Sequence, residues 1–184
     1  MVKRMIIGVS GASGAPLAVD TLRTLQKNHP EIERHLVITR GGEMTLQQEC
    51  GLKLDALYNL ASVVHDNRNI GVSIASGSFR TMGMIIVPCS MKTVSGIVCG
   101  YSDNLLLRAA DVCLKERRKL VLVAQESPLS TLHLRNLCTA SELGAVVLPP
   151  MLTYYNHPKF LEDCTHHVVN RILSQFDLDQ DSYA

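Results

Sequence analysis

The 184-residue chain carries 18 lysine and arginine residues against 17 acidic ones, and 46% of its residues are hydrophobic. This length and composition predict one domain with a sizeable core, and the balanced charge argues against nucleic acid or a lipid surface as the main partner. Aromatic residues make up only 4% and tryptophan is absent, which argues against a base-stacking platform.

Short aliphatic runs alternate along the chain with longer segments of helical periodicity. Five runs are predicted to be strands, at 5–9, 36–39, 84–88, 120–124 and 145–148. Because these runs are continuous rather than alternating, they are typical of parallel strands covered on both faces. The run at Val63–Val64 leaves strand and loop open, and residues 66–82 are predicted to form a loop.

The segments between the runs each place apolar residues on one helical face. The four predicted faces are Ala18, Leu22 and Leu25; Leu105, Ala109, Val112 and Cys113; Leu134, Leu137 and Cys138 after a Ser130 cap; and Leu161, Cys164, Val168 and Ile172. The alternation predicts an α/β fold, a Rossmann-like, doubly wound, mainly parallel sheet with helices on both faces. We expect one domain over residues 1–176 and a frayed acidic tail over residues 177–184.

Loops beyond the carboxyl ends of the strands are the candidate site, because open parallel sheets bind ligands there. These loops read SGASG (10–14), TRGGE (39–43), PCSMKT (88–93), QESPLS (125–130) and PPMLTYYNHP (149–158). Four of the five carry Ser, Thr or Gly near the strand exit, which indicates a ligand that approaches the backbone closely.

The first loop has glycines at positions 8, 11 and 14. This spacing matches neither the dinucleotide fingerprint nor a Walker A loop. A strand, a glycine turn and a helix start are suited to holding a phosphate on backbone N–H groups. A tight strand-to-helix turn without a ligand explains the same residues, so this loop alone leaves both readings open.

The third loop places Ser90 and Thr93 around Lys92 at a helix start. The hydroxyls cap such a helix with or without a ligand. Lys92, however, opposes the helix dipole in the first turn, and a bound phosphate relieves that conflict. Glu126, directly after an apolar strand, is either a partly desolvated proton donor or acceptor or an ordinary surface glutamate.

No metal site is expected. Cys164, His166 and His167 form C-x-H-H, which is not a zinc spacing, and adjacent histidines point to different sides of a helix. The six cysteines form no C-x-x-C pair, the first apolar run is too short for a secretory signal, and no run approaches the roughly 18 residues of a membrane span. We expect reduced thiols in a cytoplasmic protein.

Five segments occur together and in order: GVSGASGAP, SGSFRTMGMIIVPCSMKTVSGI, RAADVCLKERRKLVLV, ESPLSTLHL and PPMLTYYNHP. With them the chain resembles, from Met5 to Phe176, the UbiX-like flavin prenyltransferases. The resemblance implies a metal-independent enzyme that joins the dimethylallyl group of dimethylallyl phosphate to N5 and C6 of reduced FMN. The product, prenylated FMN, serves a separate UbiD-type decarboxylase. The resemblance also implies a homo-oligomer, typically a dodecamer, with active sites at subunit interfaces.

The family's functional residues carry over position by position. The resemblance implies flavin contacts at Gly11, Ala12, Ser13, Thr39, Ser90, Met91, Lys92, Thr93 and Gln125. It implies that Lys115, Tyr155 and Arg171 hold the prenyl phosphate. Ser13 and Glu126 correspond to a proton relay near N5 and the leaving phosphate, and Glu49 corresponds to another active-site carboxylate.

One position departs from the family's R-E-x-P-L, where this chain has Gln125 before Glu126. Glutamine donates hydrogen bonds but lacks the charge and the bidentate fork of arginine. A non-catalytic FMN-binding or carrier protein that lost turnover with the arginine is therefore one alternative. A flavin-dependent cysteine decarboxylase is another, although its PASANT-type segment and its tryptophan-containing clamp are replaced here by PCSMKT and PPMLTYY.

Overall fold

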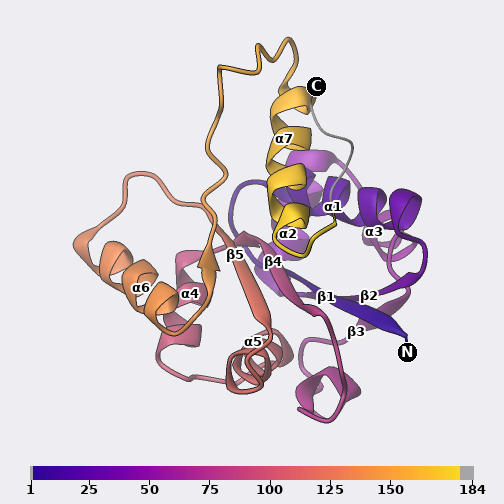
Figure 1. Ribbon diagram of the computed structural model, residues 1–184, viewed down its shortest axis with the longest axis vertical. Coiled ribbons are helices and arrows are strands. Elements are labelled where there is room, and N and C mark those ends of the chain that lie inside the picture. Colours follow the sequence, from indigo (N-terminus) through magenta and orange to yellow (C-terminus); the bar gives the residue numbers. More distant parts are fainter. Residues whose placement is uncertain (1, 179–184) are drawn as a thin grey trace.

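Six parallel strands form one sheet in the order β3-β2-β1-β4-β5-β6 (Figure 1). They are β1 (Lys3–Val9), β2 (Ile32–Ile38), β3 (Val63–His65), β4 (Gly83–Cys89), β5 (Lys119–Ala124) and β6 (Val146–Val147). The computed structural model describes residues 2–178. The central pair is β1 and β4, and the chain winds outward from it in both directions, which confirms the predicted doubly wound sheet.

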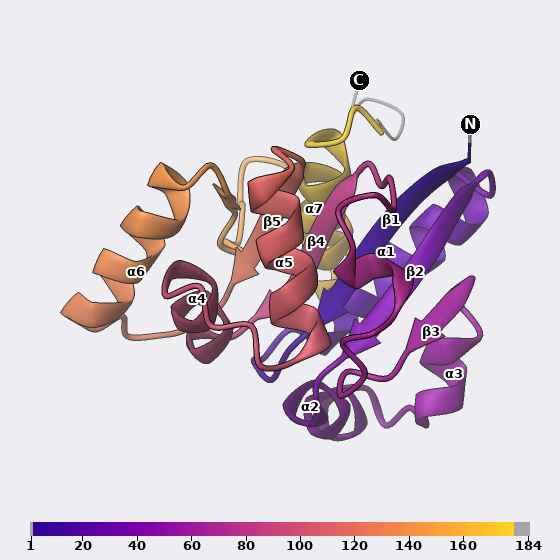
Figure 2. The same ribbon diagram turned by 90° about the horizontal axis from the view of Figure 1, so that it is seen from below.

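Helices cover both faces of this sheet, as Figure 2 shows from below. They are α1 (Ala15–Asn28), α2 (Arg40–Cys50), α3 (Leu54–Tyr58), α4 (Met91–Val98), α5 (Leu105–Lys115), α6 (Thr131–Glu142) and α7 (Leu161–Ser174), with a 3-10 turn, η1 (Ser73–Ala75). One buried cluster joins α1, α2, α3 and α7 to one face, and a second joins α4, α5 and Ala140 of α6 to the other.

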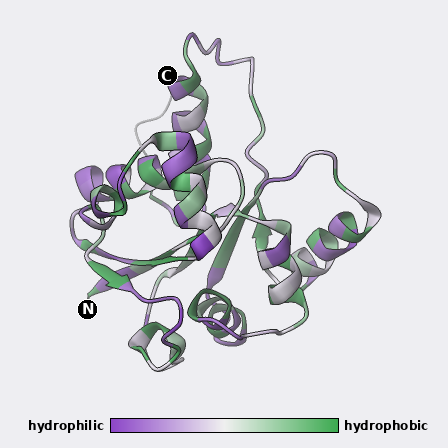
Figure 3. Ribbon diagram, turned by 180° about the vertical axis from the view of Figure 1, so that it is seen from behind, coloured by the Kyte–Doolittle hydropathy of each residue, from purple (hydrophilic) through white to green (hydrophobic). Residues whose placement is uncertain are grey.

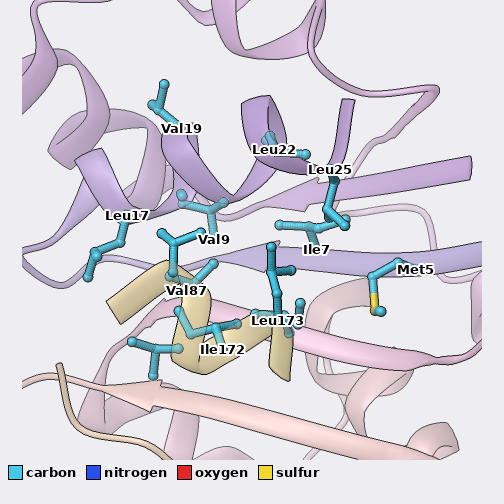
Figure 4. Close-up of a cluster of buried hydrophobic side chains, with 14 of the residues drawn as sticks. Met5, Ile7, Val9, Leu17, Val19, Leu22, Leu25, Val87, Ile172 and Leu173 are labelled. Carbon is cyan, nitrogen blue, oxygen red and sulfur yellow. The ribbon is translucent and has the colours of Figure 1, made fainter. Parts of the chain in front are cut away.

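Strand β1 is buried on both faces because its successive side chains point in opposite directions. Ile7 packs with Leu22 of α1 and Leu173 of α7 (Figure 4), whereas Ile6 joins the cluster on the other face. Burying each such side chain contributes about 1.5–3 kcal/mol. The strand therefore holds the glycine-rich loop at residues 10–14 in a fixed position at the carboxyl ends of the strands.

The predicted strands are all present, with shifted ends. β2 begins at Ile32 rather than Leu36. The predicted start is too late because polar residues interrupt the apolar pattern there. One of them, Arg34, is buried and donates from Nε to Leu60 O and from Nη1 to Ile32 O, both at 2.8 Å. These bonds compensate the burial of a charge that the apolar-run criterion excludes from a strand.

The two segments between α3 and β4 agree with the sequence pattern apart from one short turn. The ambiguous run at Val63–Val64 is a strand, β3, which pairs with β2 in parallel at the sheet edge. Residues 66–82 are loop as predicted, except for η1. The sequence leaves this strand ambiguous because its apolar run is short. At the side of the sheet, both of its valines stay about 40% exposed, at 39% and 41%.

The helical faces predicted for α1 and α5 are buried, but those predicted for α6 and the start of α7 are only partly so. Ser130 caps α6 as predicted, its Oγ accepting from His133 N at 3.2 Å. Leu134, however, is 54% exposed, Cys138 is exposed, and Leu161 is 73% exposed. Figure 3 shows hydrophobic residues on α6, which packs against α4 at one side of the molecule. These apolar faces are not covered within one chain.

The C-terminal end differs in part from the predicted tail. Leu178 is buried in the cluster that contains α1 and α7, so the chain remains packed at that point. The remainder of the predicted tail, residues 179–184, lies outside the described residues. Within residues 2–178, no helix is long and apolar enough to cross a membrane.

Two buried histidines face each other on β2 and β3. The rings of His35 and His65 stack with centroids 5.3 Å apart, and His35 Nδ1 lies 3.0 Å from His65 Nε2. Burial lowers the pKa of His35, against the opposing effect of its hydrogen bond with Glu33. Burial likewise lowers the pKa of His65, and the neighbouring His35 acts in the same direction. The folded protein therefore favours two neutral imidazoles.

We expect acid to destabilise the fold through this pair. As pH falls below the ordinary histidine pKa of about 6.5, the unfolded chain binds protons first, so stability is present above that pH and is lost below it. Each group contributes a slope of at most about 1.4 kcal/mol per pH unit. Urea unfolding between pH 7 and pH 5 should show a shallower decline for His65→Gln than for the wild type. His157→Gln, at an exposed loop histidine, is the control, and equal slopes in all three proteins would contradict the assignment.

Candidate active site

Two serines meet at the switch point between the central strands. Ser10 follows β1 and Ser90 follows β4, and the chain turns to opposite faces of the sheet after them. Ser90 N donates to Ser10 Oγ at 2.8 Å, and Ser10 Oγ donates to Pro88 O at 3.1 Å. Ser90 Oγ lies 3.1 Å from Thr93 Oγ1. A row of hydroxyls therefore runs from one loop into the first turn of α4.

Glycines allow the loops after β1 and β2 to touch backbone to backbone. A methyl group at Gly11 would lie 3.0 Å from Gly41 Cα, and one at Gly42 would lie 2.7 Å from Val9 O. Gly14, the N-cap of α1, has a φ of +113° that other residues rarely adopt. The glycine-rich segment after β1 therefore allows the close approach of another group, and in this structure that group is the backbone of the loop after β2.

Among the helices that begin at this edge of the sheet, α2, α4 and α5 each start behind a side-chain cap. Thr39 Oγ1 accepts from Gly42 N, Ser90 Oγ from Thr93 N, and Asn104 Oδ1 from Leu107 N. The N-termini of α2, α4 and α5 consequently direct their partial positive charge toward the same region.

A cavity of about 810 Å³ opens between these helix starts. Five of the predicted flavin contacts line it: Gly11, Thr39, Ser90, Lys92 and Thr93. Its wall also includes Ser10, Arg40, Gly41, Asn67, Ser95, Gly96, Cys99, Tyr101, Asp103, Asn104, Leu106 and Leu107. The structure therefore brings residues of three predicted loops into one cavity.

The remaining predicted flavin contacts in these loops lie beside the cavity wall. Ala12 and Ser13 follow Gly11 in the same loop, and Ala12 N donates to Ser10 O at 3.0 Å. Met91 is 8% exposed and belongs to the core cluster around α4 and α5. Glu49 Oε2 accepts from Gly14 N at 2.9 Å and from Ala15 N at 2.8 Å. That carboxylate caps the start of α1, directly behind the loop.

Gln125 and Glu126 follow β5, next to β4 in the sheet. Gln125 N donates to Cys89 O at 3.2 Å, which ties this loop to the end of β4. Glu126 is exposed, and its Oε1 accepts from Ser127 N at 3.1 Å. Both residues lie at the same sheet edge as the cavity without lining it.

The three predicted prenyl-phosphate residues lie apart from the cavity within one chain. Lys115 is the last residue of α5 and pairs with Glu116 at 2.6 Å. Because it lies close to the beginning of β5, it is at the amino ends of the strands, whereas the cavity lies at their carboxyl ends. Tyr155 is 74% exposed, and its hydroxyl lies 3.4 Å from His167 Nε2 on α7. Arg171 lies one turn further along α7. The single chain does not bring these three together with the flavin contacts.

Part of the cavity wall was missed by reasoning from strand exits. Asn67 follows β3, and its backbone O and Oδ1 accept from Leu105 N and Leu106 N, which fixes the start of α5. Accepting Val63–Val64 as a strand would have added this loop to the candidates. The segment at 99–104 joins two helices and follows no strand, so the exit rule does not reach it.

Metal-ligating side chains and thiols are dispersed over residues 2–178. Within residues 2–178, no three His, Cys, Asp or Glu side chains are grouped to hold a metal ion. All six cysteines are free thiols. Burial raises the pKa of Cys113 to about 12, so this thiol stays protonated and packs as an apolar side chain.

Comparison with known proteins identifies the family of the whole chain. The model of the Flavoprotein family matches residues 2–172. The chain is 50% identical over 184 residues to the flavin prenyltransferase UbiX of Escherichia coli K12, covering 99% of this chain and 97% of that protein.

Two solved structures share the fold closely. A dodecameric FMN-dependent UbiX-like decarboxylase from Escherichia coli O157:H7 superposes with a TM-score of 0.95 at 48% identity, over 98% of this chain and 97% of that one. AnUbiX (PadA1), solved in complex with FMN and dimethylallyl pyrophosphate, also gives 0.95, at 39% identity over the full length of both chains. This chain therefore belongs to the Flavoprotein family and, within it, to the UbiX-like flavin prenyltransferases.

Proposed function

We propose that the protein binds FMN in the cavity at the switch point and transfers a dimethylallyl group from dimethylallyl phosphate to N5 and C6 of the reduced flavin. The observation that carries this proposal is the convergence of Gly11, Thr39, Ser90, Lys92 and Thr93 on one cavity of about 810 Å³. Membership of a family of flavin prenyltransferases supports the same reaction.

The wall of the cavity suits a flavin nucleotide. The contact between Gly11 and Gly41 leaves backbone without side chains at its edge, where a flat ring can approach. The hydroxyls of Ser90 and Thr93 and the ammonium of Lys92 offer donors to polar and anionic groups. No metal ligand is required for either task.

When bound, reduced FMN supplies the nucleophilic positions N5 and C6. The bond to N5 would form as phosphate leaves with the electron pair of the broken carbon–oxygen bond and N5 loses its proton. The bond to C6 would use the double bond of the prenyl group, which would gain a proton as C6 loses one. We assign the proton transfers to Ser13 and Glu126, with Glu49 holding the loop that carries Ser13. Cationic side chains at the leaving phosphate stabilise its developing charge.

Lys115, Tyr155 and Arg171 fit this chemistry if neighbouring subunits complete the site. Apolar side chains are exposed on α6, on the loop after β6 and at the start of α7: Leu132, Leu134, Met151, Leu152, Phe160 and Leu161 are 54–73% exposed. Exposed apolar surface of this extent is typical of an interface. We propose a homo-oligomer, of the dodecameric kind found in the Escherichia coli O157:H7 relative, in which these three residues reach the cavity of another copy.

We further propose that the prenylated flavin passes to a UbiD-type decarboxylase in the cytoplasm. The free thiols of the chain are compatible with a reducing compartment. Activation of an apo-decarboxylase by the purified protein, FMN and dimethylallyl phosphate tests this step separately from flavin prenylation.

The position of Gln125 favours one second candidate, a flavin-binding protein of low turnover. An arginine there could form paired, charge-assisted bonds to a phosphate, each worth roughly 1.5–3 kcal/mol. We expect Gln125→Arg to tighten phosphate-ligand binding on the order of tenfold, by less at high salt. Titrations with FMN and with dimethylallyl phosphate measure this. Unchanged affinity for both ligands would show that position 125 contacts no phosphate.

Release of phosphate tests the proposed reaction itself. Anaerobic incubation with dimethylallyl phosphate should liberate phosphate only when reduced FMN is present. A protein that binds FMN without releasing phosphate would be the carrier, and a protein that binds no FMN would overturn both candidates.

A further inference from the structure

Two adjacent histidines on α7 make contacts in different directions. His166 Nδ1 lies 3.1 Å from Asp20 Oδ2 of α1, whereas His167 lies against Tyr155 in the loop between β6 and α7. Successive residues of an α-helix are about 100° apart around its axis, so the two rings face different partners. The C-x-H-H motif therefore serves two separate contacts, and the contact of His167 is the one that involves a predicted site residue.

His167 contacts both the ring and the hydroxyl of Tyr155. The two rings meet edge to face, with centroids 5.9 Å apart and an interplanar angle of 84°. His167 Nε2 lies 3.4 Å from the Tyr155 hydroxyl. Hydrogen bonds of this length at a reaction site often shorten once the substrate engages them. The imidazole therefore contacts the phenol through its ring and through a polar atom.

This contact ties an exposed loop to α7. Among the hydrogen bonds and ring contacts of residues 149–158, in the chain as described from 2 to 178, only the contact with His167 reaches another element; the others join residues of the loop itself. Tyr155 is 74% exposed, whereas His167 is partly buried. Figure 1 shows the loop extending away from the sheet before it enters α7. His167 therefore fixes where the Tyr155 hydroxyl lies relative to α7.

Arg171 follows His167 by about one helical turn on α7. Residues four apart in a helix lie on the same face, with Cβ atoms about 5–6 Å apart. The Tyr155 hydroxyl, which lies at His167, is therefore next to the position of Arg171. Tyr155 and Arg171 both serve the prenyl phosphate in the proposed function, and His167 links them.

The hydroxyl of Tyr155 carries one proton, which decides how this hydrogen bond can serve a ligand. A neutral imidazole donates from one nitrogen and accepts at the other. If Tyr155 donated to His167, its proton would not reach a phosphate. If His167 donates from Nε2, the hydroxyl accepts that bond and directs its own proton to a phosphate oxygen. In such a chain each hydrogen bond polarises and strengthens the next.

We propose that His167 is a positioning residue of the prenyl-phosphate site, which donates from Nε2 to the Tyr155 hydroxyl and so directs the proton of that hydroxyl to the phosphate. This inference rests on the proposed function, because it takes Tyr155 as a ligand of the prenyl phosphate. His167 acts through Tyr155 and does not itself touch the substrate.

Two substitutions separate the hydrogen bond from the ring contact. His167→Phe keeps an aromatic edge but has no donor, whereas His167→Gln keeps an N–H donor. We expect His167→Phe to raise the KM for dimethylallyl phosphate roughly three- to tenfold, the effect of one hydrogen bond. Its kcat and FMN affinity should be unchanged, because the bond holds the phosphate equally before and during the reaction. His167→Gln should stay close to the wild type.

His166→Gln is the matched control, since the neighbouring ring faces Asp20 instead of Tyr155. It should leave the KM for dimethylallyl phosphate unchanged. Phosphate release at saturating reduced FMN measures KM and kcat for all variants.

Tyr155→Phe completes a double-mutant cycle with His167→Phe. Because His167 acts through the hydroxyl, adding His167→Phe to Tyr155→Phe should raise the KM no further. An equal rise in both backgrounds would overturn the inference, as would an unchanged KM in His167→Phe or an equal rise in His167→Gln and His167→Phe. The proposed function stands in each of these cases.

Two other results act on the proposed function itself. An unchanged KM in Tyr155→Phe would remove the hydroxyl of Tyr155 from the phosphate site, and this inference with it, while prenyl transfer stands. Wild-type protein that releases no phosphate in the presence of reduced FMN would overturn the proposed reaction and the inference together.

Discussion

Replacing Glu126 by glutamine is expected to slow prenyl transfer by about 10²–10⁴-fold, the usual contribution of a positioned acid or base. Glutamine keeps the size of the side chain and its acceptor for Ser127 N, but it cannot exchange a proton. Because Glu126 does not line the cavity in which we place the flavin, FMN affinity should stay nearly unchanged. Anaerobic single-turnover measurements with prebound reduced FMN isolate the rate of the chemical step.

Glu142→Gln provides a control for this experiment. Glu142 is an exposed glutamate at the end of α6, away from the cavity wall, and its removal should leave the rate unchanged. A Glu126→Gln protein that turns over at the wild-type rate would remove Glu126 from the mechanism. A large loss of FMN affinity instead of rate would make it a binding residue.

Mixing two inactive variants is expected to restore activity if subunits share sites. Lys115 lies at the opposite edge of the sheet from the cavity in its own chain, so we expect it to serve the cavity of a neighbour. Lys115→Ala and Glu126→Gln should each be nearly inactive as pure oligomers. In mixed oligomers some sites combine an intact Lys115 from one copy with an intact Glu126 from another, about a quarter of them for random equal mixing across a heterologous interface.

A second pair of variants serves as the control for this mixing experiment. Ser13 and Glu126 belong to the loops after β1 and β5 at the same sheet edge, so mixing Ser13→Ala with Glu126→Gln should restore nothing. Co-expression with two affinity tags and sequential purification yields the mixed oligomers. No recovery from Lys115→Ala and Glu126→Gln, in oligomers shown to contain both chains, would contradict a shared site.

The central part of the fold follows from the sequence because its strands are apolar throughout. Ile7 and its neighbours are buried on both faces, so the pattern itself reports a parallel sheet. The start of β2 does not follow in this way, because Arg34 is buried with carbonyl partners that only the folded chain supplies. The edge strand β3 is predicted only in part, because its apolar run is short.

The apolar faces of α6 and α7 show a second limit. The periodicity of Leu134 and Leu161 correctly indicates helices with an apolar side, but both residues are more than half exposed in one chain, at 54% and 73%. A hydrophobic stripe indicates that one face of a helix becomes buried. It does not indicate whether the surface that buries it belongs to the same chain or to another copy.

The candidate site divides in the same way. Strand exits predict Thr39, Ser90 and Thr93, because the carboxyl ends of parallel strands must meet. They do not predict Tyr101 or Asp103, which reach the cavity from a connection between two helices. The family resemblance adds Lys115, whose distance from the cavity in one chain could not be foreseen from its position in the sequence.

The mass of the flavin after turnover tests the account most directly. The protein is incubated anaerobically with reduced FMN and dimethylallyl phosphate, and the released cofactor is analysed by mass spectrometry together with a control that lacks protein. We predict a flavin heavier than FMN by one isoprene unit, formed without added metal and in the presence of a chelator. Unmodified FMN recovered from protein that has demonstrably bound both ligands would contradict the assignment as a flavin prenyltransferase.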